Sequence, residues 1–204
     1  MPELEERETR IEPSPTPEAE EIYLRWIGNL DEEFARHHKP VLRAEIVRVQ
    51  LHQLFLSRPS GGKLNFTLTT ELPTNIFQLS LDSSNITLCA EYSTDLDRQK
   101  YDERKPLIWF WQMFDRSPVG LNLWLGFRLR AMLGRHIFQS IGRNVTIYPG
   151  LSLTFGYNVN IEDDCILREN VTLDDRNPIT IPKGTFVAAG SKLPEGDSTQ
   201  CDRS

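Results

Sequence analysis

The sequence has no long hydrophobic run, since nowhere do about 18 apolar residues follow one another. A membrane-spanning helix is therefore not predicted. Cysteine is also scarce. The three cysteines, Cys89, Cys165 and Cys201, are far apart in the sequence and odd in number. They predict neither a disulfide framework nor a CxxC metal site. Cys165 falls in a strand-like run, where we expect it to be packed and not exposed as a nucleophile.

The chain has no excess of basic residues, because 23 Lys and Arg stand against 29 Asp and Glu, for a net charge of −6. This balance does not favour nucleic-acid binding. Much of the acidic charge lies at the start, where the residues MPELEERETR do not resemble a secretory signal peptide. We expect a disordered acidic tail over residues 1–15 and a cytoplasmic protein.

Capping signals predict two helices at the start of the ordered chain. Thr16 can cap a helix that begins at Pro17 and runs to about residue 36, and Pro40 can open a second helix to about Leu56. Three runs of alternating apolar and polar residues follow, at 64–68, 77–81 and 86–92. This alternation predicts a three-stranded meander. Residues 16–95 are therefore predicted to be a small α+β unit.

A six-residue apolar period dominates the second half of the chain. The spacings run six, six and eight, and the pattern repeats through three triplets: Ile141, Ile147, Leu153, Ile161, Leu167, Leu173, Ile181, Val187 and Leu193. Neither an α-helix nor an ordinary strand has this period. A β-helix of hexapeptide repeats has it, because three six-residue units make one triangular coil. We predict about three coils over residues 141–194, followed by a flexible tail at 195–204.

Residues 96–140, between these two regions, are predicted to be a charged linker followed by apolar helices. In the stretch 107–138 several leucines share one helical face, and tryptophans and arginines lie beside them. One interpretation is a helix that closes the open end of the first coil, as terminal caps do in repeat proteins. The other is an amphipathic helix that contacts a membrane surface. We favour the cap, because the polar face is thin and an open coil end must be covered.

Residues 141–175 read IGRNVT, IYPGLS, LTFGYNVN, IEDDCI, LRENVT and LDD, and residues 181–194 read IPKGTFVAAGSKLP. These phrases resemble the left-handed β-helix of hexapeptide-repeat acyltransferases. The first phrase is similar to the opening of sugar O-acetyltransferases of the maltose, galactoside and nodulation type. The second is similar to their closing coils. The expected fold is thus an α+β N-terminal region followed by a short left-handed parallel β-helix.

The resemblance implies a function, a donor and partners. It implies transfer of an acetyl or acyl group from acetyl-CoA or another acyl-CoA to a hydroxyl of a saccharide-like acceptor. It also implies a homotrimer without a metal. The closing phrase would bind the donor through four small residues: Ala188, Ala189, Gly190 and Ser191.

The sequence departs from the family where the chemistry should be. Family members carry a catalytic histidine, the general base, between the LDD coil and the closing coils. Here Asp175 is followed almost at once by the closing coil, and the last histidine of the chain is His136. His136 is a candidate base, although a histidine at a helix end also interacts well with the helix dipole. Asp174 and Asp175, which match the family's acidic pair, are candidates if their pKa is raised.

Two hypotheses therefore stay open. The chain is an acyltransferase-like protein, active or degenerate, or it is a non-catalytic β-helix scaffold or assembly subunit that partners a full-length acyltransferase. The sequence leaves open whether the protein is an enzyme.

Overall fold

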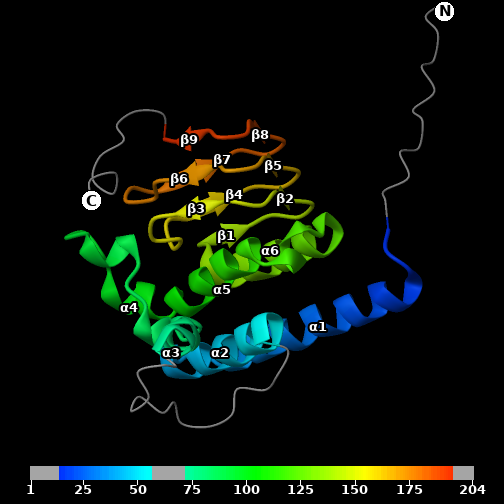
Figure 1. Cartoon of the computed structure of the whole chain (residues 1–204). Coiled ribbons are helices and arrows are strands. Elements are labelled where there is room, and N and C mark those ends of the chain that lie inside the picture. The colour runs from blue at the N-terminus through cyan, green and yellow to red at the C-terminus, as the bar shows by residue number, and fades with distance from the viewer. Residues whose placement is uncertain (1–13, 57–71, 195–204) are drawn as a thin grey trace, which may run out of the picture.

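The structure is a computed structural model, and it describes residues 14–56 and 72–194. The predicted tail at 195–204 lies outside the described residues, as does the predicted acidic tail apart from its last two positions. The helices are α1 (Pro17–Arg36), α2 (Pro40–Leu56), α3 (Leu72–Ser80), α4 (Arg98–Asp102), α5 (Lys105–Arg116) and α6 (Leu123–Ile137), with 3₁₀ turns at Ser83–Asn85, Cys89–Tyr92 and Pro118–Leu121. Figure 1 shows α1 and α2 as the lowest layer, α5 and α6 above them, and the strands stacked above α6.

The first two helices begin and end close to where the sequence predicts. The Thr16 side chain accepts a hydrogen bond from the Ala19 N–H (3.4 Å), and Pro17 takes the first helical position. α1 buries Ile27, Leu30 and Phe34 on one face. α2 begins at Pro40 and packs against α5. Both predicted helices are confirmed.

The predicted meander is wrong where the structure describes it. The run at 77–81 belongs largely to α3, and the run at 86–92 ends in a 3₁₀ turn. The first run, at 64–68, lies outside the described residues. An alternating run places two of its apolar residues four apart, and residues four apart also share a helical face. Helical packing decides between the two, since the Phe77 ring meets the Phe55 ring of α2 edge-on at 6.0 Å.

The apolar stretch at 107–138 forms two helices with a break between them. α5 buries Leu107, Phe110 and Phe114, and α6 buries Leu129 and Leu133. α6 contacts the two first strands of the coil stack, and α1 covers it from below. This is the cap arrangement that the sequence favours, and Leu125, Leu129 and Leu133 of α6 are buried by the protein's own coil and helices.

A buried ion pair fastens the cap to the first coil. Arg130 on α6 is fully buried, and its Nε donates to Asp115 Oδ1 at the end of α5 (2.8 Å). Arg130 Nη1 donates to the Ile147 carbonyl (3.4 Å), while Asp115 Oδ2 accepts from the Gly150 N–H (2.9 Å). Arg130 and Asp115 therefore bond each other and also a backbone group of the first coil, which gives these polar groups hydrogen-bond partners in both layers.

The strands form coils with the predicted period. They are β1 (Ser140–Ile141), β2 (Thr146–Ile147), β3 (Ser152–Leu153), β4 (Val159–Ile161), β5 (Ile166–Leu167), β6 (Thr172–Leu173), β7 (Ile179–Ile181), β8 (Phe186–Val187) and β9 (Lys192–Leu193). Within the described chain they make three parallel sheets: β1-β4-β7, β2-β5-β8 and β3-β6-β9. Ile147 pairs with Leu167 and Leu167 with Val187, so that the predicted apolar ladder is the register of the sheets. The ladder side chains fill the interior of the stack.

The turns between the strands use the left-handed backbone region. Asn144 and Asn170 have φ values of 56° and 58°, as expected for asparagines at such corners, and Asp164 has 62°. Gly156 is required at its turn, because its φ is +84° and an added Cβ would lie 2.6 Å from Ile137 Cγ2 of α6.

The outermost coil carries two prolines at positions where the inner coils donate hydrogen bonds. The Glu162 N–H donates to Ile181 O (3.0 Å) and the Asp174 N–H to Leu193 O (2.7 Å). One coil further on, the equivalent positions are Pro182 and Pro194, which have no N–H. On the remaining side the equivalent residue, Ala188, keeps its N–H.

Candidate functional site

Asp175 lies inside the coil stack. It follows β6, is fully buried, and accepts hydrogen bonds from three backbone N–H groups: those of Thr154 (3.1 Å), Phe155 (2.7 Å) and Asn158 (3.2 Å). Burial raises the pKa of the Asp175 carboxyl, although the backbone hydrogen bonds act against this rise. The carboxylate therefore holds the enlarged corner of the coil below it, and its lone pairs face protein and not a substrate.

Asp174 points in the other direction and pairs with a neighbour. Arg176 Nε donates to Asp174 Oδ1 (2.8 Å), and the Thr154 hydroxyl donates to the same oxygen (3.3 Å). The hydrogen bonds from Arg176 hold the pKa of Asp174 below its usual value. A carboxylate with a lowered pKa is a weak general base at neutral pH.

His136 lies in the helical layers. Its Nε2 is 2.7 Å from Asp31 Oδ1 on α1, and Asp31 Oδ2 accepts from Arg135 (2.7 Å). The imidazole also meets the Phe34 ring edge-on at 5.8 Å. Burial lowers the pKa of His136 more than Asp31 raises it. His136 thus joins α6 to α1, and none of these contacts is with Asp174 or Asp175.

The four residues predicted to bind the donor lie at a corner of the outermost coil. Ala188, Ala189 and Gly190 are exposed after β8, and Ser191 is half-buried. The Ser191 N–H donates to the Ala188 carbonyl (3.2 Å) and closes a turn. The structure therefore does not bring the three candidate bases and this corner into one site.

Cys165 is packed, as the sequence predicts. It is free and fully buried in the middle coil, and its Sγ–H donates to the Pro182 carbonyl (3.1 Å). A buried thiol without a basic neighbour is inert.

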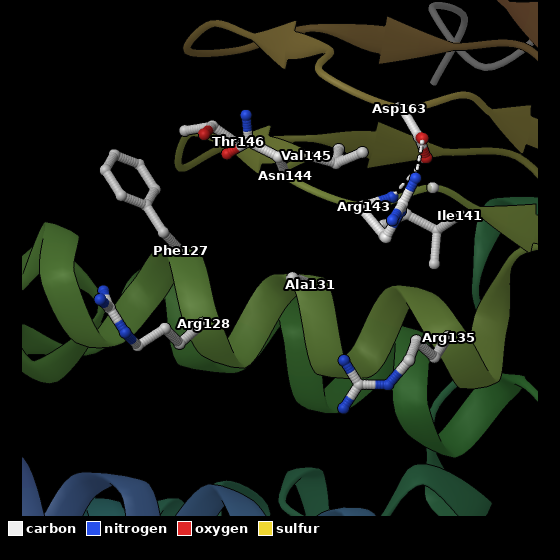
Figure 2. A pocket seen from close by; sticks show the side chains of 11 residues that line it. Phe127, Arg128, Ala131, Arg135, Ile141, Arg143, Asn144, Val145, Thr146 and Asp163 are labelled. Atoms are coloured by element: carbon white, nitrogen blue, oxygen red, sulfur yellow. Dashed lines mark hydrogen bonds and ion pairs between the residues drawn. The ribbon is translucent and has the colours of Figure 1, made fainter. Parts of the chain in front are cut away.

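A groove of about 770 Å³ lies between α6 and the first coil. Its lining residues are Phe127, Arg128, Ala131, Arg135, Ile141, Gly142, Arg143, Asn144, Val145, Thr146 and Asp163. Figure 2 shows Phe127 and Ala131 on the side of α6 that faces the coil, and Arg143 on the coil, where it is joined to Asp163. The groove is therefore the place where side chains of the cap and of the coil meet around open space.

Three arginines line the groove and only one acid does, which is Asp163. Arg143 Nη2 lies 3.2 Å from Asp163 Oδ2, and the backbone N–H and guanidinium of Arg143 lower the pKa of that carboxyl. Arg128 stacks on the Trp124 ring at 3.7 Å, and Arg135 bonds Asp31. Two of the three arginines are thus paired with acids, and the lining also includes the apolar side chains of Ala131, Ile141 and Val145.

Comparison with protein-family models, with curated proteins and with solved structures finds no match to this chain. In the part of the chain that the structure describes, no group of three or more His, Cys, Asp or Glu side chains could hold a metal ion. Over the same residues, no helix has both the length and the apolar character needed to cross a membrane.

The groove was not predicted from the sequence. Arg128 and Arg135 are seven positions apart on one predicted helix, which places them on the same side. This spacing is the only sign of the groove in the sequence. Arg143 comes near the two other arginines only when α6 packs beneath the first coil.

Proposed function

We propose that residues 141–194 are a left-handed β-helix of the hexapeptide-repeat type that acts as a non-catalytic assembly module. The left hand of the coils is supported by the resemblance of both repeat phrases to the acyltransferase family. The parallel register of the ladder residues agrees with such a fold. In this proposal the module partners a second β-helix, either a copy of this chain in a homotrimer or a full-length acyltransferase.

The observation that carries the proposal is the bonding of Asp175. Of the candidate bases it has the raised pKa that catalysis would need, yet both of its oxygens are occupied by the backbone N–H groups of the corner below. A general base must reach the proton that it abstracts, and a fully buried carboxylate does not. Asp174 is paired with Arg176, and His136 is hydrogen-bonded to Asp31 of α1.

A partner surface is available on the coils. On the outer face of β2-β5-β8 the register places Ile166 next to Phe186, and these side chains are 38% and 62% exposed. Apolar side chains stacked on a flat, exposed sheet favour association with another protein surface. We propose this face as the contact with the second β-helix.

Acetyl-CoA turnover tests the proposal. The purified chain is incubated with acetyl-CoA and a panel of saccharides, and the release of free thiol is followed. We expect no release above the rate without protein, and a molar mass in solution above that of one chain. The non-catalytic assignment would be overturned if the parent chain released thiol and at least one of the variants Asp174→Asn and His136→Ala released it more slowly.

One observation favours a second candidate, a CoA-dependent O-acyltransferase with a saccharide-like acceptor. The small residues at 188–190 are exposed beside Phe186, so that the backbone of this corner is open to a ligand lying on the sheet. If the corner binds the donor, millimolar acetyl-CoA raises the melting temperature and Ala188→Trp removes the rise. An unchanged melting temperature in the parent protein would count against this candidate.

A further inference from the structure

The groove between α6 and the first coil has two chemically different ends. Figure 2 shows Arg135 and Arg143 toward one end and Phe127 toward the other. Phe127 and Arg135 are separated by eight positions on α6, which corresponds to roughly 12 Å along a helix that rises 1.5 Å per residue. Ala131 lies between them and has a side chain too small to fill the space. The groove therefore suits an elongated ligand.

The basic end can bind a dianion more tightly than its present partner. The Arg143 side chain is 92% exposed, and its pair with Asp163 is a surface ion pair of the kind that contributes little to stability. A phosphate group carries more charge than a carboxylate, and it matches the planar fork of a guanidinium in a bidentate way. Arg135, toward the same end, is 52% exposed, but its guanidinium is bound to Asp31 of α1 and does not point toward the coil in Figure 2.

The other end offers an apolar and aromatic surface. The Phe127 ring meets Tyr148 of the first coil at 4.8 Å, and Ala131, Ile141 and Val145 complete the wall along the groove. Arg128, which follows Phe127 on α6, lies at this end as well and stacks on the Trp124 ring. The aromatic and aliphatic side chains can pack against an organic group.

We propose that this groove binds a phosphate ester, with the phosphate at Arg143 and the organic part along Ala131 toward Phe127. The ligand is a soluble phosphate ester or the phosphate headgroup of a lipid. Leu121 and Leu123, which precede the Phe127 end of α6, are 75% and 45% exposed and would reach the acyl region in the lipid case. This site goes beyond the assembly role, because it needs neither a partner chain nor turnover.

Binding of phenyl phosphate and of inorganic phosphate to the full chain, measured by calorimetry, tests the site. We expect saturable binding of phenyl phosphate that is tighter than that of inorganic phosphate. Arg143→Gln should weaken phenyl phosphate roughly tenfold, because a hydrogen bond between charged groups is lost. Phe127→Ala should reduce the preference for phenyl phosphate, and Asp163→Asn should tighten both ligands by removing the competing acid.

Arg36→Gln is the matched control, because Arg36 is an exposed arginine paired with Glu32 and Glu33 on α1. The proposal is overturned if phenyl phosphate does not bind, if Arg143→Gln leaves its affinity unchanged, or if Arg36→Gln weakens it equally. Circular dichroism of each variant verifies that the fold is intact.

Vesicle flotation separates the two sources of the phosphate. Vesicles of phosphatidylcholine alone are compared with vesicles that also contain phosphatidic acid. Flotation only with phosphatidic acid, lost in both Arg143→Gln and Leu121→Ser, assigns the groove to a lipid headgroup. A protein that binds phenyl phosphate and stays in the soluble fraction supports the soluble ester, whereas flotation with phosphatidylcholine alone that survives Arg143→Gln contradicts the lipid headgroup.

Discussion

The coil stack and the helical layers beneath it are stabilised in different ways. In the coils one backbone pattern recurs every 20 residues, as in the pairing of Ser140 with Asn160. In the helical layers a few buried arginines bond several unrelated groups each. Arg43, for example, donates to the carbonyls of Phe34, His37 and Glu103. A repeat thus spreads its stability over equivalent contacts, whereas the cap depends on side chains that have no equivalent.

The largest expected effect is at the ion pair that joins the two regions. Arg130→Ala leaves Asp115 without its partner in a site that is 9% exposed, and we expect the free energy of unfolding to fall by about 3–5 kcal/mol. Denaturant unfolding measures it. Arg36→Ala on the surface of α1 is the control, with an expected loss below about 1 kcal/mol. Similar losses in both variants would show that the cap does not depend on this pair.

Next in size is a cavity in the middle coil. Leu167 is fully buried between Ile147 and Val187, and Leu167→Ala should cost about 3 kcal/mol through lost burial and an unfilled cavity. Leu193→Ala, in the outermost coil where the side chain is partly exposed, should cost less than half as much. Equal costs would contradict the view that inner and outer coils are supported differently.

A smaller loss is expected at the coil corner. Asp175→Ala removes the acceptor for three backbone N–H groups, one buried and two partly buried, and should cost about 2–3 kcal/mol, while Asp175→Asn keeps one oxygen and should cost less. Asp174→Ala is the adjacent control, with an expected loss below about 1 kcal/mol, because its side chain is 31% exposed. Urea unfolding of the three variants ranks them. If Asp174→Ala were the worst, Asp175 would not hold the corner.

The smallest effect is a dependence of stability on pH at the α1–α6 contact. The pKa of His136 is lower in the fold than its ordinary value of 6.5, so the unfolded chain binds more protons just below that pH. The His136 contribution is therefore fully present above about pH 6.5 and falls as the pH drops toward the folded pKa. His136→Gln should flatten unfolding free energy against pH across that window. If the parent protein instead gained stability relative to the variant as the pH fell below about 6.5, Asp31 would raise the pKa of His136 more than burial lowers it.

The coils could be predicted from the sequence because their period is global. Nine apolar residues keep the same spacing, and no helix or flat sheet accommodates it. Thr16 and Pro40 likewise predicted helix starts, since capping is a local property. The alternating run that contains Phe77 was misjudged, because a short run fits a strand or a helix and only its packing partner on α2 decides.

The roles of the candidate residues could not be predicted, because they depend on the direction in which each side chain points. Asp174 and Asp175 are neighbours in sequence and were treated as one acidic pair, yet successive extended residues face opposite ways. One carboxylate bonds Arg176 and the other the interior of the corner. His136 could be placed near the end of its helix, but its partner Asp31 is 105 residues away in the chain.

The two prolines of the outermost coil determine how a stack of such coils can grow. A parallel coil presents the same row of donors upward at every level, so its free end is a template for the next layer, whether from this chain or another. At Pro182 and Pro194 two of the three sides have lost a donor from that row. The addition of a further coil at this tip, and with it lengthwise polymerisation into a fibre, is therefore opposed.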